Sequence, residues 1–548
     1  MGTAGCCVWH LGADGRLGMN TKEPGPDSTS GDYDAMAGYW RKAQTMLDGA
    51  DAMRDAGELY LPKFPLERKK NYEYRRANAK FTNIFRDIVE HLASKPFAKP
   101  VVVDPNKVGS QIKALADDID SAGNNLHVFA SRVFFAGIAK AVDYIMVDYT
   151  DVPVGATMAQ EKAMGARPYW VQIAAENVVA VETAMVNGKE EFVHVRILEP
   201  TKVRSRWTET IKERVRVYDR PKTKDLETGL DTYGEPTWEL YEKQKLQTGE
   251  WVWVKIGSGA LRVGKITLVP FVTGRRKGTS WQFEPPMRDA ADLQIEHYQQ
   301  ETNLKSAKEL TCFPMLKGKG IAPPPQDKSG RAKALEIGPA AVLYAPPTRD
   351  GMSGDWDFLE PGAESLKFLA DQVDKTEQQL RELGRQPLTA QSGNLTVITT
   401  AVAASKGNSA VQAWALALKD ALELALQYTA LWLKDTTSKA EVTVYTDFGI
   451  ETSDASSMDQ VLTMRAAGDL DRESMWDEAQ RRGVLSADFD AEAAKERLAE
   501  EAPAEPSAEE LAASMLPGKQ PPPGNPTPPT NDRTGKTGNT DPPALKAA

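Results

Sequence analysis

Residues 285–310, PPMRDAADLQIEHYQQETNLKSAKEL, predict a long helix around which the rest of the chain can be ordered. Two prolines open the stretch, at the place where a helix N-terminus tolerates them. The apolar residues Met287, Ala291, Ile295 and Tyr298 then follow at spacings of 4, 4 and 3, which places them on one face of a helix. We therefore expect a helix over about 283–310 with one apolar face.

A second helix is predicted downstream, at 362–384, from a heptad-like seam. Its apolar positions step alternately by 3 and 4 residues and are Leu366, Leu369, Val373, Thr376, Leu380 and Leu383. Because the seam is shorter than three heptads, it favours a helix packed on a neighbour over a free coiled coil.

The segment between these two helices is basic, although the chain as a whole carries a net charge of −10. Residues 305–333 contain two acidic side chains against seven basic ones, which are Lys305, Lys308, Lys317, Lys319, Lys328, Arg331 and Lys333. Two interpretations remain open: ordinary loop lysines, or a surface that docks an acidic partner or nucleic acid.

After the second helix, residues 386–405, QPLTAQSGNLTVITTAVAAS, contain no charged side chain. They offer no general base, no partner for a nucleophile and no metal ligand. A flexible linker and a surface that must avoid charge both remain open. A long helix is predicted from about 400 to 434, with Gly407 as its expected kink. Its second half is apolar on almost every face, so other elements should surround it.

The first half of the chain predicts helices followed by a β-rich block. A helix at 33–57 precedes a basic-aromatic run, and a helix pair with a buried strand is expected over 110–149. Strands alternate with turns from 168 to 274, and Asn187-Gly188 marks a hairpin. The basic-aromatic run predicts a solvated face, or else a patch that contacts phosphate or another subunit, through Arg68, Lys69, Lys70, Arg75 and Arg76.

The two ends of the chain differ in composition from the middle. The first 32 residues are rich in glycine, aspartate and serine and predict a mobile arm. A strand at 441–448 and a helical piece follow the long helix. Residues 503–548 contain eleven prolines and no aromatic residue, which predicts disorder. At 548 residues, the chain should form two to four domains or one elongated subunit.

Charge and residue usage argue against several classes of protein. An acidic chain is a poor free-standing nucleic-acid binder, although DNA could pass it without being gripped. The adjacent Cys6 and Cys7, a distant Cys312 and five histidines without an i,i+4 pair give neither a disulfide framework nor zinc spacing, so a reducing compartment and no metal or cofactor are expected. Charged residues interrupt the most apolar stretch, 409–433, so no membrane span is expected.

Catalytic motifs are also missing from the sequence. The pair Gly264-Lys265 is followed by Ile266 where a phosphate loop needs Ser or Thr, so a β-turn is the favoured interpretation. The carboxylates Asp117, Asp118 and Asp120 could hold magnesium in a nuclease, but such clusters are more often a solvated face. We therefore expect a protein that is not an enzyme.

Several short sequence motifs, and the order of the predicted parts, resemble those of tailed-bacteriophage portal proteins. The similarity covers roughly residues 40–500 and is carried by the shared order of its motifs. These motifs are YLPKF at 60–64, YEYRRANAKFTN at 72–83, VDYIMVDY at 142–149, RPYWVQIAAENVV at 167–179, PPMRDAADLQIEHYQQETN at 285–303 and RRGVLSADFDAEAAKERLAEE at 481–501.

The resemblance implies an elongated α+β subunit of portal type, with the long helix kinked. Its parts would be a mobile N-terminal arm at 1–32, an α/β wing at 33–282, a first stem helix at 283–310, a clip at 311–361, a second stem helix at 362–384, a tunnel loop at 385–398, a long wing helix and strand at 399–450, a helical crown at 451–502 and a disordered Pro-rich tail at 503–548.

Three sets of residues acquire expected roles from this resemblance. The tunnel loop would line a DNA channel with Gln386, Thr389, Gln391, Ser392, Asn394 and Thr396. The clip would offer a basic docking surface of Lys317, Lys319, Lys328, Arg331 and Lys333. The stem helices would pack through Leu366, Leu369, Val373, Leu380 and Leu383.

The resemblance to portal proteins also implies which molecules the chain would bind. The chain would form a homo-oligomeric ring, usually a dodecamer, at one capsid vertex of the virion, after assembly in the host bacterial cytoplasm. The ring would dock the terminase large subunit, contact the major capsid and scaffolding proteins, seat head-completion or tail adaptor proteins, and pass double-stranded DNA. A head–tail adaptor or minor capsid protein without a DNA channel remains an alternative, as does a phage nuclease or ATPase.

Overall fold

The parts of the chain that the computed structural model describes are residues 10–11, 17–18, 25–153, 155, 157–224, 231–312, 315–320, 354–359, 363–385, 397–446, 448, 455–481, 485 and 489–501. They belong to two compact units, Met1–Ile450 and Glu451–Ala548. The chain mixes helices with antiparallel sheets, so the predicted α+β class is confirmed.

The β-rich block of the first unit forms a five-stranded antiparallel sheet with the order β14-β13-β10-β7-β6. The hairpin predicted at Asn187-Gly188 is confirmed, because Val186 pairs with Lys189 and both turn residues have positive φ. The strands of this sheet are β6 (Val178–Val186), β7 (Lys189–Leu198), β10 (Arg214–Asp219), β13 (Thr237–Lys245) and β14 (Trp251–Ala260). Two further hairpins are inserted between them in the sequence: β8 (Thr201–Ser205) pairs with β9 (Thr208–Lys212), and β11 (Lys222–Lys224) pairs with β12 (Asp231–Tyr233).

A smaller sheet with the order β15-β4-β5 provides the centre of the first unit. Its strands are β4 (Val142–Tyr149), β5 (Pro168–Ile173) and β15 (Leu268–Val272). The first six residues of β4 are buried, as the apolar run predicted. The long helix predicted at about 400–434 is α10 (Val397–Leu433), and it contacts all three strands and the helix α6 (Leu126–Lys140).

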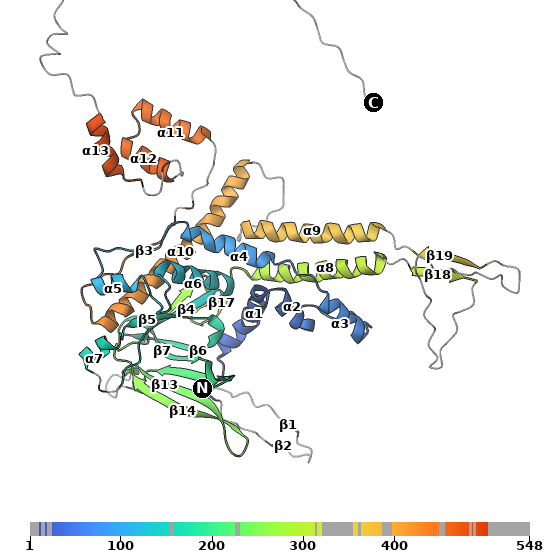
Figure 1. The fold of residues 1–548 in the computed structure, drawn as a ribbon, viewed down its shortest axis with the longest axis horizontal. Coiled ribbons are helices and arrows are strands. Elements are labelled where there is room, and N and C mark those ends of the chain that lie inside the picture. The colour runs from blue at the N-terminus through green and yellow to red at the C-terminus, as the bar shows by residue number, and fades with distance from the viewer. Residues whose placement is uncertain are drawn as a thin grey trace, which may run out of the picture. The chain divides into compact units, whose positions relative to one another are not determined.

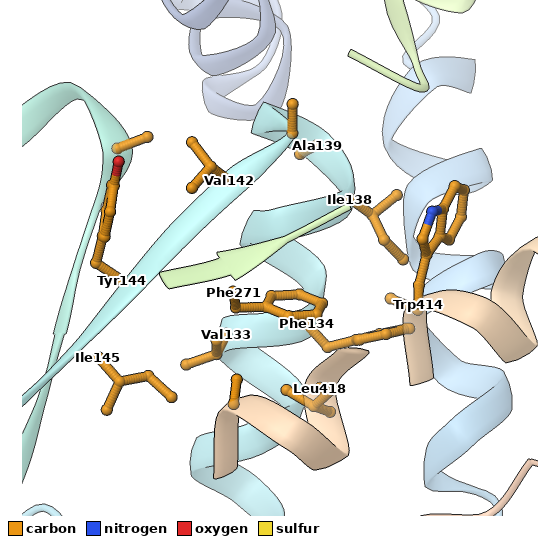
Figure 2. Packing of buried hydrophobic residues seen from close by; sticks show 14 of the residues in the cluster. Val133, Phe134, Ile138, Ala139, Val142, Tyr144, Ile145, Phe271, Trp414 and Leu418 are labelled. Carbon is orange, nitrogen blue, oxygen red and sulfur yellow. The ribbon is translucent and has the colours of Figure 1, made fainter. Parts of the chain in front are cut away.

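The core of the first unit lies where α6, α10 and this smaller sheet meet. Figure 2 shows Phe134 of α6 and Phe271 of β15 together with Trp414 and Leu418 of α10. The two phenylalanine rings stack with their centroids 5.6 Å apart. Gly137 of α6 makes this close approach possible, because a Cβ atom there would lie 2.3 Å from the Phe271 ring.

Apart from the elements between Arg288 and Arg385, the other described elements of this unit are helices, 3-10 turns and short paired strands (Figure 1). The helices are α1 (Gly31–Asp48), α2 (Ala50–Asp55), α3 (Lys69–Ala77), α4 (Ile84–Ser94), α5 (Ser110–Leu115) and α7 (Met158–Ala163), with the 3-10 turns η1 (Gly57–Leu59), η2 (Lys95–Phe97) and η3 (Ala175–Asn177). Short paired strands are β1 (His10–Leu11) with β2 (Leu17–Gly18), β3 (Val102–Val103) with β20 (Val442–Thr443), and β16 (Arg275–Arg276) with β17 (Phe283–Glu284).

Several sequence-based expectations take a different form in the structure. The strand predicted at 441–448 is limited to Val442–Thr443, after which Tyr445 packs edge-on against Phe448. Residues 25–30, within the predicted arm, contact the body: Ser28 Oγ accepts a hydrogen bond from Arg196 at 2.6 Å and Ser30 caps α1. The kink at Gly407 stays a prediction, and the tail predicted at 503–548 lies outside the described residues.

The described residues of the second unit form the helices α11 (Ala455–Ala467), α12 (Arg472–Arg481) and α13 (Ala491–Glu501), in agreement with the predicted helical piece. Trp476 of α12 is buried and packs edge-on against Phe489. Asp471 and Asp490 accept hydrogen bonds from backbone N–H groups at the starts of α12 and α13. Throughout the described part of the chain, each helix is too short or too polar to span a membrane.

The close approach at Gly137 can be tested by Gly137→Ala. Alanine normally favours a helix over glycine by about 1 kcal/mol, but here its methyl group would collide with the buried Phe271 ring. Overpacking of this kind costs about 1–3 kcal/mol, so we expect the midpoint of thermal unfolding to fall. The matched control is Gly38→Ala in α1, where nothing lies within 4 Å and the midpoint should rise. Equal shifts for both variants would contradict this account of the core.

Candidate functional site

The segment that stands apart from the α/β core is a helix pair joined through a hairpin. The helices α8 (Arg288–Cys312) and α9 (Ala363–Arg385) lie side by side and project from the body (Figure 1). At their far end, β18 (Met315–Lys319) pairs antiparallel with β19 (Asp355–Leu359). The chain therefore runs outward along α8 and returns along α9, and residues 386–396 connect it to α10.

A buried glutamine attaches α8 to the start of α4. Gln294 is fully buried, and its Oε1 accepts hydrogen bonds from the backbone N–H groups of Ile84 at 3.0 Å and Phe85 at 2.9 Å. Its Nε2 donates to the carbonyl oxygen of Thr82 at 3.0 Å. The following N–H group of α4, that of Arg86, donates a hydrogen bond to Oδ1 of the Asn83 side chain. A side chain from α8 thus supplies the acceptors that the first turn of α4 lacks.

Further along α8, a second set of polar contacts holds the same segment. Glu301 is nearly buried and accepts hydrogen bonds from the N–H and hydroxyl of Thr82, and its carboxylate pairs with Lys80 at 2.6 Å. Lys305 donates to the carbonyl oxygen of Asn78 at 2.8 Å. Because these bonds follow one face of α8 over three turns, they fix both the height and the rotation of the helix against residues 78–85.

The heptad-like seam of α9 is buried at one end and exposed at the other. Val373, Thr376 and Leu380 are buried and Leu383 is half-buried, whereas Leu366 is half-buried and Leu369 is exposed. The Thr376 hydroxyl donates to Gln300 Oε1 of α8 at 2.8 Å. The inner part of the seam packs against α8 and α4 of the same chain. The outer part, toward the hairpin, leaves apolar surface facing out.

A histidine without a hydrogen bond lies within the helix pair. His297 of α8 is fully buried, and neither ring nitrogen has a partner among the described residues. Burial lowers the pKa of His297, while the nearby carboxylates of Glu301 and Glu377 act in the opposite direction. The ring is therefore neutral near pH 7, and its protonation would place an unsolvated charge inside the pair.

The structure describes only some of the residues to which the sequence assigned roles. In the basic set, Lys319 is exposed at the end of β18 and Lys317 lies within β18, whereas Lys328, Arg331 and Lys333 lie outside the described residues. The six candidate channel residues between Gln386 and Thr396 also lie outside them. Their roles in docking and in lining a channel stay predictions.

The basic-aromatic run before α4 divides into buried and exposed members. Arg75 is buried, with a two-point contact to Glu67 at 3.0 and 2.8 Å and a further bond to Asn303 of α8. The other basic residues predicted there are exposed or half-buried, and they are Arg68, Lys69, Lys70 and Arg76. One member of the run therefore supports the fold, and the rest remain available at the surface.

Residues considered for phosphate or metal chemistry have other roles in the structure. Gly264 lies in a tight turn between β14 and β15, as predicted, and Lys265 pairs with Glu191 at 2.5 Å. Asp120 accepts hydrogen bonds from its own loop and from Arg132, and Asp118 pairs with Arg167. In the described part of the chain, no three His, Cys, Asp or Glu side chains gather closely enough to hold a metal ion.

Sequence patterns did not reveal the importance of Gln294, His297 and Glu301. A signal was present, because Gln294 falls between Ala291 and Tyr298 on the stripe predicted to be buried. A polar residue on an apolar stripe must find a partner when buried. Which partner it finds depends on residues 78–85, more than two hundred positions away in the sequence, and no periodicity records that contact.

Comparisons with known proteins match this part of the chain. Residues 286–433, which run from the start of α8 to the end of α10, match a family described as Domain of unknown function (DUF4055). No curated protein sequence matches the chain. Two similar solved structures are a chain from the neck of a native GTA particle computed with C12 symmetry and one from the neck of an empty GTA particle computed with C6 symmetry.

Both neck chains are distant in sequence and in shape. Each is 11% identical to this protein with a TM-score of 0.34. The likeness to the native-particle chain covers 80% of this protein and 99% of that chain, and the likeness to the empty-particle chain covers 75% and 94%.

The attachment of α8 can be tested by Gln294→Leu. The substitution introduces an apolar helix former of similar size and leaves the Phe85 N–H and the Thr82 carbonyl without their side-chain partner. Unpaired buried polar groups cost about 1–3 kcal/mol, so we expect a loss of that size in the free energy of unfolding, measured with urea. The control is Gln378→Leu on the exposed face of α9, for which less than about 0.5 kcal/mol is expected. A Gln294 variant as stable as this control would refute the attachment.

The buried His297 predicts that acid destabilises the helix pair. The folded-state pKa of His297 is lowered, so the unfolded chain binds more protons as the pH falls through the ordinary histidine value of about 6.5. Stability should therefore decrease between pH 7.5 and 5.5. His297→Leu should reduce this decrease and should leave the protein at least as stable at pH 7.5, because it removes two unpaired polar atoms. An unchanged pH dependence of the unfolding midpoint would contradict this role.

Proposed function

We propose that this protein is a portal-type subunit of a tailed phage or phage-like particle. In this role it forms a ring at one capsid vertex, docks the packaging motor, passes double-stranded DNA through its centre and carries head-completion or tail proteins. The chain itself has no catalytic activity, because the motor supplies the work of translocation. In this role, the helices α8 and α9 act as the stem, the β18–β19 hairpin region acts as the clip, and residues 386–396 act as the tunnel loop.

The observation that carries the proposal is the order of parts within one compact unit. A projecting helix pair with a hairpin at its tip is followed by a short uncharged segment and then by a helix of 37 residues that is packed into the α/β core. This is the order by which the sequence resembles portal proteins. The rigid attachment of α8 supports it as well, because a stem must hold its position in the ring while DNA moves.

The uncharged segment supplies a physical reason for a channel role. Each lysine on such a loop would add one phosphate contact per subunit, and phosphate contacts dominate the affinity of proteins for DNA. A ring of carboxylates would instead repel the DNA. Residues 386–396 contain hydroxyl and amide side chains and no charged ones. They can therefore touch the DNA backbone weakly and release it.

Removing the protein from assembling heads distinguishes a portal from an adaptor. We expect heads assembled without this chain to contain no packaged DNA, measured as nuclease-resistant DNA per head. If such heads filled with DNA and lacked only their tails, the portal proposal would be wrong and the adaptor alternative would hold.

The channel role of the uncharged segment can be tested by Ser392→Lys, with Ser392→Asn as the control. The lysine should slow packaging in vitro, and added salt should relieve the defect because it weakens phosphate contacts. Heads should still form, and the asparagine variant should package at the wild-type rate. A lysine variant that packages at the wild-type rate at low salt would show that residue 392 does not meet the DNA.

A further inference from the structure

Residues 57–77 form a ledge on α8 with exposed apolar side chains, here called the ledge surface. Leu59, Phe64, Leu66 and Tyr74 are all exposed, and Leu66 has a relative accessibility of 102%. Leu66 also has a φ of 65°, a left-handed conformation that costs a residue with a Cβ about 1–2 kcal/mol. Backbone strain of this kind tends to occur at functional positions. The fold thus holds a large apolar side chain outward at a cost in stability.

The ledge surface is rigid as well as exposed. Arg75 is buried beneath it, bonds Glu67 with two nitrogens, donates to the Pro62 carbonyl at 2.9 Å and lies 4.1 Å from the centre of the Phe64 ring. Gln299 of α8 donates to the Tyr60 carbonyl at 2.9 Å. A surface that is already ordered loses little conformational entropy on binding. The ledge is therefore suited to docking.

The ledge is also strongly basic. Residues 63–76 contain six basic and two acidic side chains, and one of the acidic residues, Glu67, is occupied by the buried Arg75. The exposed basic residues are Lys63, Arg68, Lys69 and Lys70. A matching partner should combine apolar side chains with an excess of acidic ones.

The outward face of α9, here called the α9 surface, has both properties. Phe368 is exposed with a relative accessibility of 68%, and Leu369 beside it is exposed too. Residues 364–383 contain five acidic and three basic side chains. Asp371 and Asp374, one and two turns further along the helix, are both exposed. The two surfaces are therefore complementary in charge, and each presents large apolar side chains.

The ledge and α9 lie on opposite sides of α8 and are attached to it at a similar height. Figure 1 shows α8 running between α9 and α3. On α8, Gln300 bonds Thr376 of α9 and Asn303 bonds Arg75 of the ledge, so the two attachment points are about 4.5 Å apart along the helix at 1.5 Å per residue. Phe368 lies eight residues before Thr376 on α9, about 12 Å nearer the hairpin. Rotation about an axis parallel to the helix pair preserves height. The ledge of one copy would thus face α9 of the next.

We propose that the ledge surface of one copy docks on the α9 surface of a neighbouring copy, so that copies join head to tail. The occupant of each surface is a second copy of this chain, and the inference rests on the proposed ring. Because the two surfaces are different, the contact is heterologous, which is the type that closes rings. The exposed outer part of the α9 seam becomes buried in this contact.

The experiment uses full-length protein with one surface broken at a time. The ledge variant is Leu66→Asp with Tyr74→Asp, and the α9 variant is Phe368→Asp. Each should be a folded monomer where the wild type is a ring, with the half-assembly concentration raised by roughly 30-fold or more, as on truncation of an interface hot spot. The control is Trp207→Asp on the exposed β8–β9 turn, which should still form rings. Mass is measured by light scattering and folding by circular dichroism.

Mixing the two variants tests the head-to-tail geometry directly. The ledge variant keeps an intact α9 surface and the α9 variant keeps an intact ledge, so an equimolar mixture should form a dimer of one copy of each and stop there. Failure to form this dimer, rings from either variant alone at wild-type concentrations, or a wild-type protein that stays monomeric would overturn the inference. The portal proposal has its own test, since heads that package DNA without this protein refute it whatever these variants do.

Discussion

The placement of the helix pair depends on one buried amide. Gln294 lies inside α8, yet its three hydrogen bonds go to residues 82–85, where α4 begins. The contact has two consequences. The first turn of α4 obtains a hydrogen-bond acceptor that the residues next to it in sequence do not provide. The helix α8 can take only one rotation, because turning it about its axis would bury the amide without partners. The neighbouring contacts of Glu301 and Lys305 depend on that same rotation.

This constraint links the fold to the proposed assembly. Once α8 is fixed, α9 is placed on one side of it through Thr376, and the ledge on the other through Arg75. Both outward surfaces are therefore presented by a rigid support. Exposed basic residues gather in the ledge, where a protein partner could use them. The segment proposed to face DNA carries no charge at all.

Sequence patterns predicted the elements better than their contacts. The helices α8, α9 and α10 followed from apolar spacing, and the β6–β7 hairpin followed from Asn187-Gly188, because periodicity and turn chemistry are local. The contacts of Gln294 with residues 82–85 and of Arg75 with Asn303 did not follow, since each joins residues more than two hundred positions apart. The strand predicted at 441–448 was too long, because only Val442 and Thr443 find a partner strand, the two-residue β3.

The most direct measurement is cryo-electron microscopy of the purified full-length protein, with its oligomer mass determined on the same sample. The account predicts a closed ring in which the helix pairs run along the axis around an open channel, with residues 386–396 at its narrowest point. A two-fold dimer, an open filament, or a ring whose helix pairs radiate outward would contradict it.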